Sequence, residues 1–174
     1  MHDSVAGDPM WFVAQGSGNS INVVKMTNVL SSSATFTTTN LSVNAYSTVV
    51  DPRQPDGTAI TTNIDSRIQK AAEFNHTIVA AHAVSTSATE DDARWYAINV
   101  SGATPTILDQ GNVSAGNNKY LVYPSIDINS TGDIGMNSMN GQTGVDTPKC
   151  QLAAMPIPLF QQCGTTNRPR AAAI

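Results

Sequence analysis

The chain has few charged residues, few aromatic residues and only two cysteines. Charged side chains make up 13% of its 174 residues, and the formal net charge is -4. Because no basic patch occurs, we expect no nucleic-acid partner. No run of about 18 apolar residues occurs either, so we expect no membrane span. The first twelve residues, MHDSVAGDPMWF, lack the basic and apolar regions of a signal peptide, so we expect a signal peptide to be absent or to have been removed.

Sequence motifs of several enzyme classes are also missing. The two cysteines, Cys150 and Cys163, match no zinc-binding pattern and form either one disulfide or two free thiols. A disulfide would fit an oxidising compartment. The chain has no G-x-S-x-G elbow, no HExxH pair, no P-loop and no GxGxxG stretch. An α/β-type serine hydrolase and a nucleotide-binding site are therefore disfavoured.

The residues that are abundant favour strands. Hydrophobic residues make up 40% of the chain, with many β-branched Thr, Val and Ile, while the helix formers Glu and Lys are scarce. Trp11 and Trp95 can anchor a core. This balance, together with many polar turn residues, predicts an all-β protein that is extracellular, periplasmic or on the cell surface.

A trio of strand-like segments occurs twice in the same order. The first trio lies at 9–16, 20–28 and 34–43, and the second lies at 77–84, 94–102 and 104–114. A lead-in segment at 64–74, IDSRIQKAAEF, precedes the second trio, although its apolar spacing also suits an amphipathic helix. The stretch 123–137, YPSIDINSTGDIGMN, repeats this lead-in, with a turn at 129–133 in which Gly132 can adopt a positive φ.

Four-stranded units in tandem are the signature of a β-propeller. We therefore predict an all-β fold of propeller-type four-stranded blades, with an N-terminal tail at 1–8, propeller-like repeats at 9–141 and an irregular segment at 142–174. The chain holds only about two and a half blades, whereas propellers have about four to eight. Either it is a fragment of a longer protein, or several copies assemble as a homo-oligomer, or it forms a small β-sandwich instead.

The repeats resemble those of a known group of proteins. WFVAQG, INVVKMTN, NIDSRIQKAAEFNHTIVAAHAV, DDARWYAINVSG and YPSIDINSTGDIGMN are similar to the repeats of large secreted bacterial proteins described as sialidase-like or Asp-box-like β-propellers of unknown activity. The resemblance covers residues 9–140. It implies a propeller architecture and a secreted location, but no agreed reaction.

Two groups of residues are candidate calcium ligands. Asp127, Asn129 and Asp133 place oxygen ligands at alternating positions with a Gly at the sixth, as calcium loops do. A hairpin turn closed by its own side chains explains the same pattern. Asp91 and Asp92 belong to a short acidic run that either holds calcium or is a solvated loop.

Four residues around the lead-in segment are candidate catalytic residues. Asp65 and Arg67 share one face of the predicted strand, and Glu73 and His76 lie beside the turn that follows it. In a propeller such turns reach the central channel, where His76 or a carboxylate would act as a general base. An ion pair and a hydrogen-bonded structural histidine explain the same residues.

Two functions are compatible with these features. The first is a hydrolase of glycosidic, ester or lactone bonds, assisted by calcium, acting on a small-molecule or carbohydrate substrate. The second is a non-catalytic module of a large bacterial surface protein that binds glycans or other proteins through its loop tips.

Overall fold

The computed structural model describes residues 3–60, 65–142 and 150–155, and within them all regular structure is β-strand. The ten strands are β1 (Met10–Gln15), β2 (Ser20–Thr27), β3 (Thr35–Ser42), β4 (Lys70–Phe74), β5 (Thr77–Ser87), β6 (Glu90–Asn99), β7 (Thr106–Val113), β8 (Lys119–Ile128), β9 (Ile134–Gln142) and β10 (Cys150–Met155). No helix in the described part of the chain is long and apolar enough to cross a membrane.

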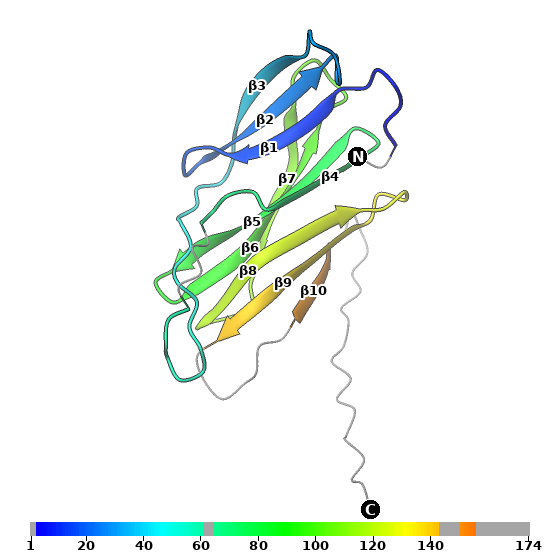
Figure 1. Ribbon diagram of the computed structural model, residues 1–174. Helices are drawn as coiled ribbons and strands as arrows, with labels where there is room; N and C mark the ends of the chain where they lie inside the picture. Colours follow the sequence, from blue (N-terminus) through cyan, green and yellow to red (C-terminus); the bar gives the residue numbers. More distant parts are fainter. Residues whose placement is uncertain (1–2, 61–64, 143–149, 156–174) are drawn as a thin grey trace, which may run out of the picture.

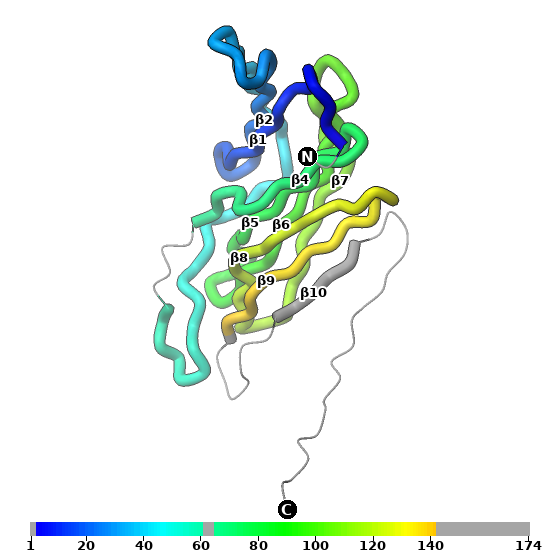
Figure 2. Tube along the Cα trace, turned by 45° about the vertical axis from the view of Figure 1, so that its right-hand side comes forward, coloured from blue at the N-terminus to red at the C-terminus, as the bar shows by residue number. Residues whose placement is uncertain are grey.

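The strands form three antiparallel meanders. β1–β3 form a separate three-stranded sheet, which we call the first layer. β4–β7 form the middle layer, and β8–β10 form the last layer. The middle and last layers are joined through one parallel pair, Asp91 with Tyr120. Figures 1 and 2 show the first and last layers at opposite ends, with the middle layer between them.

Two hydrophobic clusters hold the layers together, one on each face of the middle layer. Between the first and middle layers the buried residues are Ile21, Val23, Leu41, Val43, Ile78, Tyr96, Ile98 and Val100. Between the middle and last layers they are Ala72, Val79, Ala81, Ala93, Leu121, Ile126, Ile128, Ile134 and Met136. Because side chains alternate along a strand, neighbouring residues of β5 such as Ile78 and Val79 contribute to different clusters.

Two hairpin turns in these layers matter for the candidate sites. The β4–β5 turn consists of Asn75 and His76, whose φ angles of 48° and 60° are those of a two-residue type I′ turn. The β8–β9 turn spans 129–133, and Gly132 has the predicted positive φ, at 88°. Each turn reverses the direction of the chain, and the residue pairs next to it contain no β-bulge.

The predicted all-β class and most of the predicted strands are confirmed. The lead-in strand is shorter than predicted, because only Lys70–Phe74 forms β4. Ser66 instead packs against an irregular segment, where the Val49 N–H donates to its hydroxyl at 3.3 Å. The solvated-loop interpretation of the acidic run is wrong, since Glu90, Asp91 and Asp92 lie inside β6.

Other predictions are left open by the described residues. The strands form no closed ring within 3–60, 65–142 and 150–155. Most of the segment 142–174, including Cys163, lies outside the described residues, as does the side chain of Cys150. The disulfide prediction therefore stays a prediction.

Candidate functional site

The β8–β9 turn is closed by its own side chains. The Asn129 side-chain oxygen accepts hydrogen bonds from the backbone N–H groups of Thr131 at 3.0 Å and Asp133 at 2.8 Å. The Asn129 side-chain amide donates to the Asp133 carboxylate at 2.9 Å. The Thr131 hydroxyl lies 2.5 Å from that carboxylate and 2.7 Å from the Asn129 oxygen. These contacts close the turn by hydrogen bonds within 129–133 and leave its polar residues on the surface.

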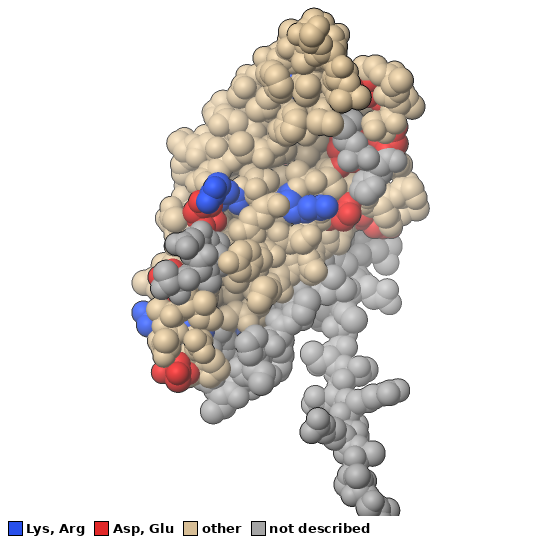
Figure 3. Space-filling view, viewed as in Figure 1, with Lys and Arg blue, Asp and Glu red and all other residues tan. Residues whose placement is uncertain are grey.

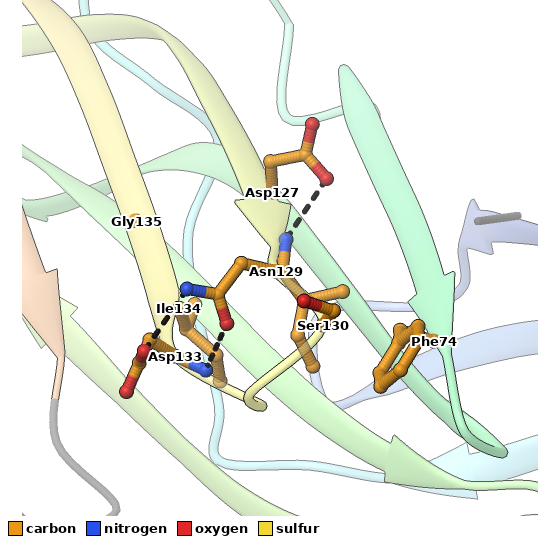
Figure 4. Close-up of a pocket in the computed structure, with 8 residues that line it drawn as sticks. Phe74, Asp127, Asn129, Ser130, Asp133, Ile134 and Gly135 are labelled. Carbon is orange, nitrogen blue, oxygen red and sulfur yellow. Dashed lines mark hydrogen bonds between the residues drawn. The ribbon is translucent and has the colours of Figure 1, made fainter. Parts of the chain in front are cut away.

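A shallow depression of about 650 Å³ lies beside this turn. Its lining consists of Phe74, Asp127, Ile128, Asn129, Ser130, Asp133, Ile134 and Gly135. Phe74 comes from the end of β4, so the depression spans the middle and last layers. Figure 4 shows the Phe74 ring beside the turn, with Asn129 directed toward Asp133. An aromatic surface therefore lies next to hydroxyl, amide and carboxylate groups.

The depression carries negative charge. Hydrogen bonds from Thr131 and then Asn129 lower the pKa of the Asp133 carboxyl. The Asp127 carboxylate accepts the N–H of Ile128 at 2.8 Å. Figure 4 shows the carboxylates of Asp127 and Asp133 pointing in different directions. They are not arranged as a facing pair of catalytic carboxylates around one substrate atom.

The predicted calcium ligands Asp127, Asn129 and Asp133 all line this depression, but their geometry fits a hairpin turn better than a calcium loop. The Asn129 oxygen already accepts two backbone N–H groups, and a cation would have to replace them. In the described residues no three His, Cys, Asp or Glu side chains gather as a metal site. Calcium therefore stays a prediction of the sequence.

Two predicted catalytic residues, Glu73 and His76, meet at the β4–β5 turn. The Glu73 carboxylate accepts the backbone N–H of His76 at 2.9 Å, and Glu73 is buried. The His76 carbonyl accepts the N–H of Val100 at 2.9 Å, while its side chain is exposed. The contact between Glu73 and His76 thus supports the turn, and it uses the backbone of His76 rather than the imidazole.

The other two predicted catalytic residues, Asp65 and Arg67, lie elsewhere. They form an exposed ion pair at 2.5 Å before the start of β4. This pair lowers the pKa of Asp65 and raises that of Arg67. β4 runs for five residues between this pair and the β4–β5 turn, a length of roughly 16 Å. The four predicted catalytic residues therefore do not converge on one point.

The predicted metal ligands Asp91 and Asp92 are buried in β6. Asp91 is fully buried, and Asp92 is 5% exposed. Successive strand residues point to opposite faces, so the two carboxylates do not form a common site. One Asp91 oxygen accepts the Val50 N–H at 3.0 Å, and the other has no hydrogen-bond partner among the described residues. Burial raises the pKa of Asp91 to about 6.

A buried polar cluster that includes His82 lies between the first and middle layers. His82 Nδ1 lies 2.6 Å from the Ser66 carbonyl, which can only accept, so Nδ1 carries the proton. His82 Nε2 accepts from the Tyr96 hydroxyl at 2.9 Å, and Tyr46 packs edge-on against the imidazole. Burial lowers the pKa of His82 to about 4. His82 is therefore a neutral structural residue.

Arg94 completes this interior. Its guanidinium donates to the Asn112 side chain at 2.6 Å and to the Asn44 carbonyl at 2.7 Å. Asn112 in turn donates to Asp92 at 3.1 Å. Little in the sequence indicates this network, since it joins the β6–β7 hairpin to an irregular segment around Asn44 that is distant in the chain. Only the apolar run around His82 indicated its burial.

No family model, no curated protein and no solved structure matches this chain. The assignment of a function therefore depends on the geometry described above.

Proposed function

We propose that the three layers are consecutive blades of an open propeller-type arc. The order of the meanders along the chain supports this proposal, because each packs on the next as blades do. The middle layer consists of four antiparallel strands, as one propeller blade does. The β8–β9 hairpin repeats the β4–β5 hairpin in sequence, which is expected of a blade array.

We further propose that the chain is a non-catalytic module that binds glycans at the depression beside the β8–β9 turn. The observation that carries this proposal is that the Phe74 ring lines the same depression as Asp127, Asn129 and Ser130. A sugar presents an apolar C–H face and a rim of hydroxyl groups. An aromatic ring suits the face, and carboxylate, amide and hydroxyl groups suit the rim.

The separation of the predicted catalytic residues favours binding over hydrolysis. Acid–base catalysis needs groups within hydrogen-bond reach of the same substrate atoms. Asp65 and Arg67 neutralise each other at one end of β4, and Glu73 supports the turn at the other end. The depression itself is shallow and open, which suits reversible binding to an extended glycan.

A binding experiment with a matched control tests this proposal. The full chain is titrated with a panel of oligosaccharides, with Asp127→Asn as the test variant and Asp109→Asn as the control. Both carboxylates are exposed and accept the N–H of the next residue at 2.8 Å, but only Asp127 lines the depression. We expect Asp127→Asn to weaken glycan affinity about tenfold, the scale of one lost hydrogen bond to a charged group.

The control variant Asp109→Asn should bind as the wild type does. Equal affinity of the two variants would place the glycan elsewhere on the molecule. Binding of no oligosaccharide by folded protein would refute the glycan proposal. Turnover of chromogenic glycosides, esters or lactones by the same preparation would refute the proposal that the chain is non-catalytic and would support a hydrolase.

A further inference from the structure

The first layer leaves one apolar face bare. Met10, Met26 and Phe36 lie side by side across β1, β2 and β3, and Phe12 and Val24 form the adjoining row. We call these five residues the first-layer face. Phe36 is 62% exposed and Phe12 is 44% exposed. The view in Figure 3 shows almost no charged side chains over β1–β3. Contiguous exposed apolar surface of this kind marks interaction sites.

Among the described residues, the last layer also leaves one face bare, at the opposite end of the molecule. On β9 the buried residues alternate with exposed ones, and the exposed Asn137 and Met139 point away from the middle layer. Tyr123 and Ser125 of β8 are exposed beside them. We call these four residues the last-layer face. Tyr123 is 46% exposed and Met139 is 57% exposed, and Tyr and Met are residues enriched in interfaces.

The sequence match between β1 and β5 indicates what kind of surface would pack against the first-layer face. Phe12-Val13-Ala14 matches Ile78-Val79-Ala80 of β5. Ile78 is only 2% exposed, because the inner side of the first layer covers it. Phe12 is therefore equivalent to a residue of the middle layer that is covered by the preceding layer.

The same comparison identifies what belongs on the last-layer face. The β8–β9 hairpin matches the β4–β5 hairpin, so that Ile134 corresponds to Ile78 and Asn137 corresponds to Ala81. Ala81 is fully buried by the layer that follows it. The last-layer face therefore stands where a following layer would pack. The two bare faces are the two halves of one front-to-back contact.

From this match we infer that copies of the chain associate head to tail, the first-layer face of one copy packing on the last-layer face of the next. The occupant of each face is a second copy of this chain, since a single chain carries both halves of the contact at opposite ends. Such a contact is heterologous, and it closes into a ring or continues as a filament. The inference depends on the order of the layers and not on glycan binding.

Light scattering on the full chain over a dilution series tests the association. We expect the wild type to exceed the mass of one chain, and we expect Phe36→Asp and Met139→Asp each to reduce it to that of one chain. Leu108→Asp is the matched control, because Leu108 is 52% exposed on β7 and belongs to neither face. All three positions are exposed, so each variant should keep the circular dichroism spectrum of the wild type.

A mixing experiment distinguishes a head-to-tail contact from a contact between like faces. The Phe36→Asp chain keeps an intact last-layer face, and the Met139→Asp chain keeps an intact first-layer face. Mixed in equal amounts, they should form pairs of twice the single-chain mass. A wild type that stays monomeric at the highest concentration overturns the inference. A mixture that forms no pairs, or a loss of association in the Leu108→Asp control, also overturns it.

Discussion

The hairpins β4–β5 and β8–β9 match in sequence, but β5 is covered on both faces and β9 on one. β5 is buried without interruption from Ile78 to Val84. In β9 the buried Ile134, Met136 and Ser138 alternate with exposed residues. The sequences show the same difference, since TIVAAHAV is a continuous apolar run and IGMNSM alternates. The pattern of apolar residues along a strand therefore indicates whether one or both of its faces are covered by other layers.

The largest expected effect comes from placing the same charge at matched positions of the two hairpins. Ala81→Asp puts an unpaired carboxylate between the middle and last layers, whereas Asn137→Asp puts one on an exposed face. At a protein concentration low enough for the chain to be a monomer, we expect Ala81→Asp to reduce the free energy of unfolding by more than about 4 kcal/mol, and Asn137→Asp to change it by less than about 0.5 kcal/mol. Urea unfolding followed by circular dichroism measures both. A folded Ala81→Asp protein with the wild-type midpoint would show that β5 is not covered on both faces.

The hairpins also differ in their buried polar residue, which is His82 in β5 and Ser138 at the matched position of β9. Only His82 titrates. Its pKa is lowered from 6.5 to about 4, so it stabilises the fold above pH 6.5, and this contribution is lost as the pH falls toward 4. Asp91 acts in the opposite direction. Its pKa is raised from 3.8 to about 6, so its contribution is present below pH 3.8 and is lost as the pH rises toward 6.

Asp91→Asn should therefore reveal the contribution of His82. In the wild type the two groups offset each other between pH 4 and 6. In Asp91→Asn we expect the free energy of unfolding to decrease by up to about 3 kcal/mol as the pH falls from 6.5 to 4. Urea unfolding at several pH values measures this slope, with the exposed Asp109→Asn as the control. A variant whose free energy of unfolding does not decrease between pH 6.5 and 4 would mean that folding does not lower the pKa of His82.

The strand pattern and one turn could be predicted from the sequence because they depend on local information. Alternation and apolar runs placed most strands, and Gly132 indicated the positive φ in the β8–β9 turn. The burial of Asp91 and Asp92 could not be predicted in this way. An acidic run by itself suits a solvated loop. Its burial in β6 depends on Val50, which comes from an irregular segment earlier in the chain, and on Asn112 of the neighbouring strand β7.

In the candidate site, too, some features depend on local sequence and others depend on contacts between separate parts of the chain. The sequence identified Asp127, Asn129 and Asp133 as a group, because they are neighbours in one turn. It did not indicate Phe74, which reaches the depression from another hairpin. The separation of Asp65 and Arg67 from Glu73 and His76 depends on where β4 begins, and the boundary of a strand is weakly encoded when its lead-in segment also suits a helix.

The smallest expected effect concerns the two hairpin turns, which are stabilised in different ways. The β4–β5 turn depends on backbone contacts, since the N–H of His76 binds Glu73 and the carbonyl of His76 accepts from Val100. His76→Gly keeps both contacts and relieves a φ of 60° that side chains disfavour. We expect it to leave the free energy of unfolding unchanged or to raise it by up to about 0.5 kcal/mol.

In the β8–β9 turn the contacts are made by the Asn129 side chain, so Asn129→Gly should lower the free energy of unfolding by about 1 kcal/mol. Urea unfolding of the two variants side by side measures the difference, and a His76→Gly protein less stable than Asn129→Gly would contradict it.

The same His76→Gly protein also tests the remaining case for catalysis. If hydrolysis of any ester, lactone or glycoside is detected in the wild type and persists at the same rate in His76→Gly, the imidazole is not its general base. The role of His76 is then confined to turning the chain.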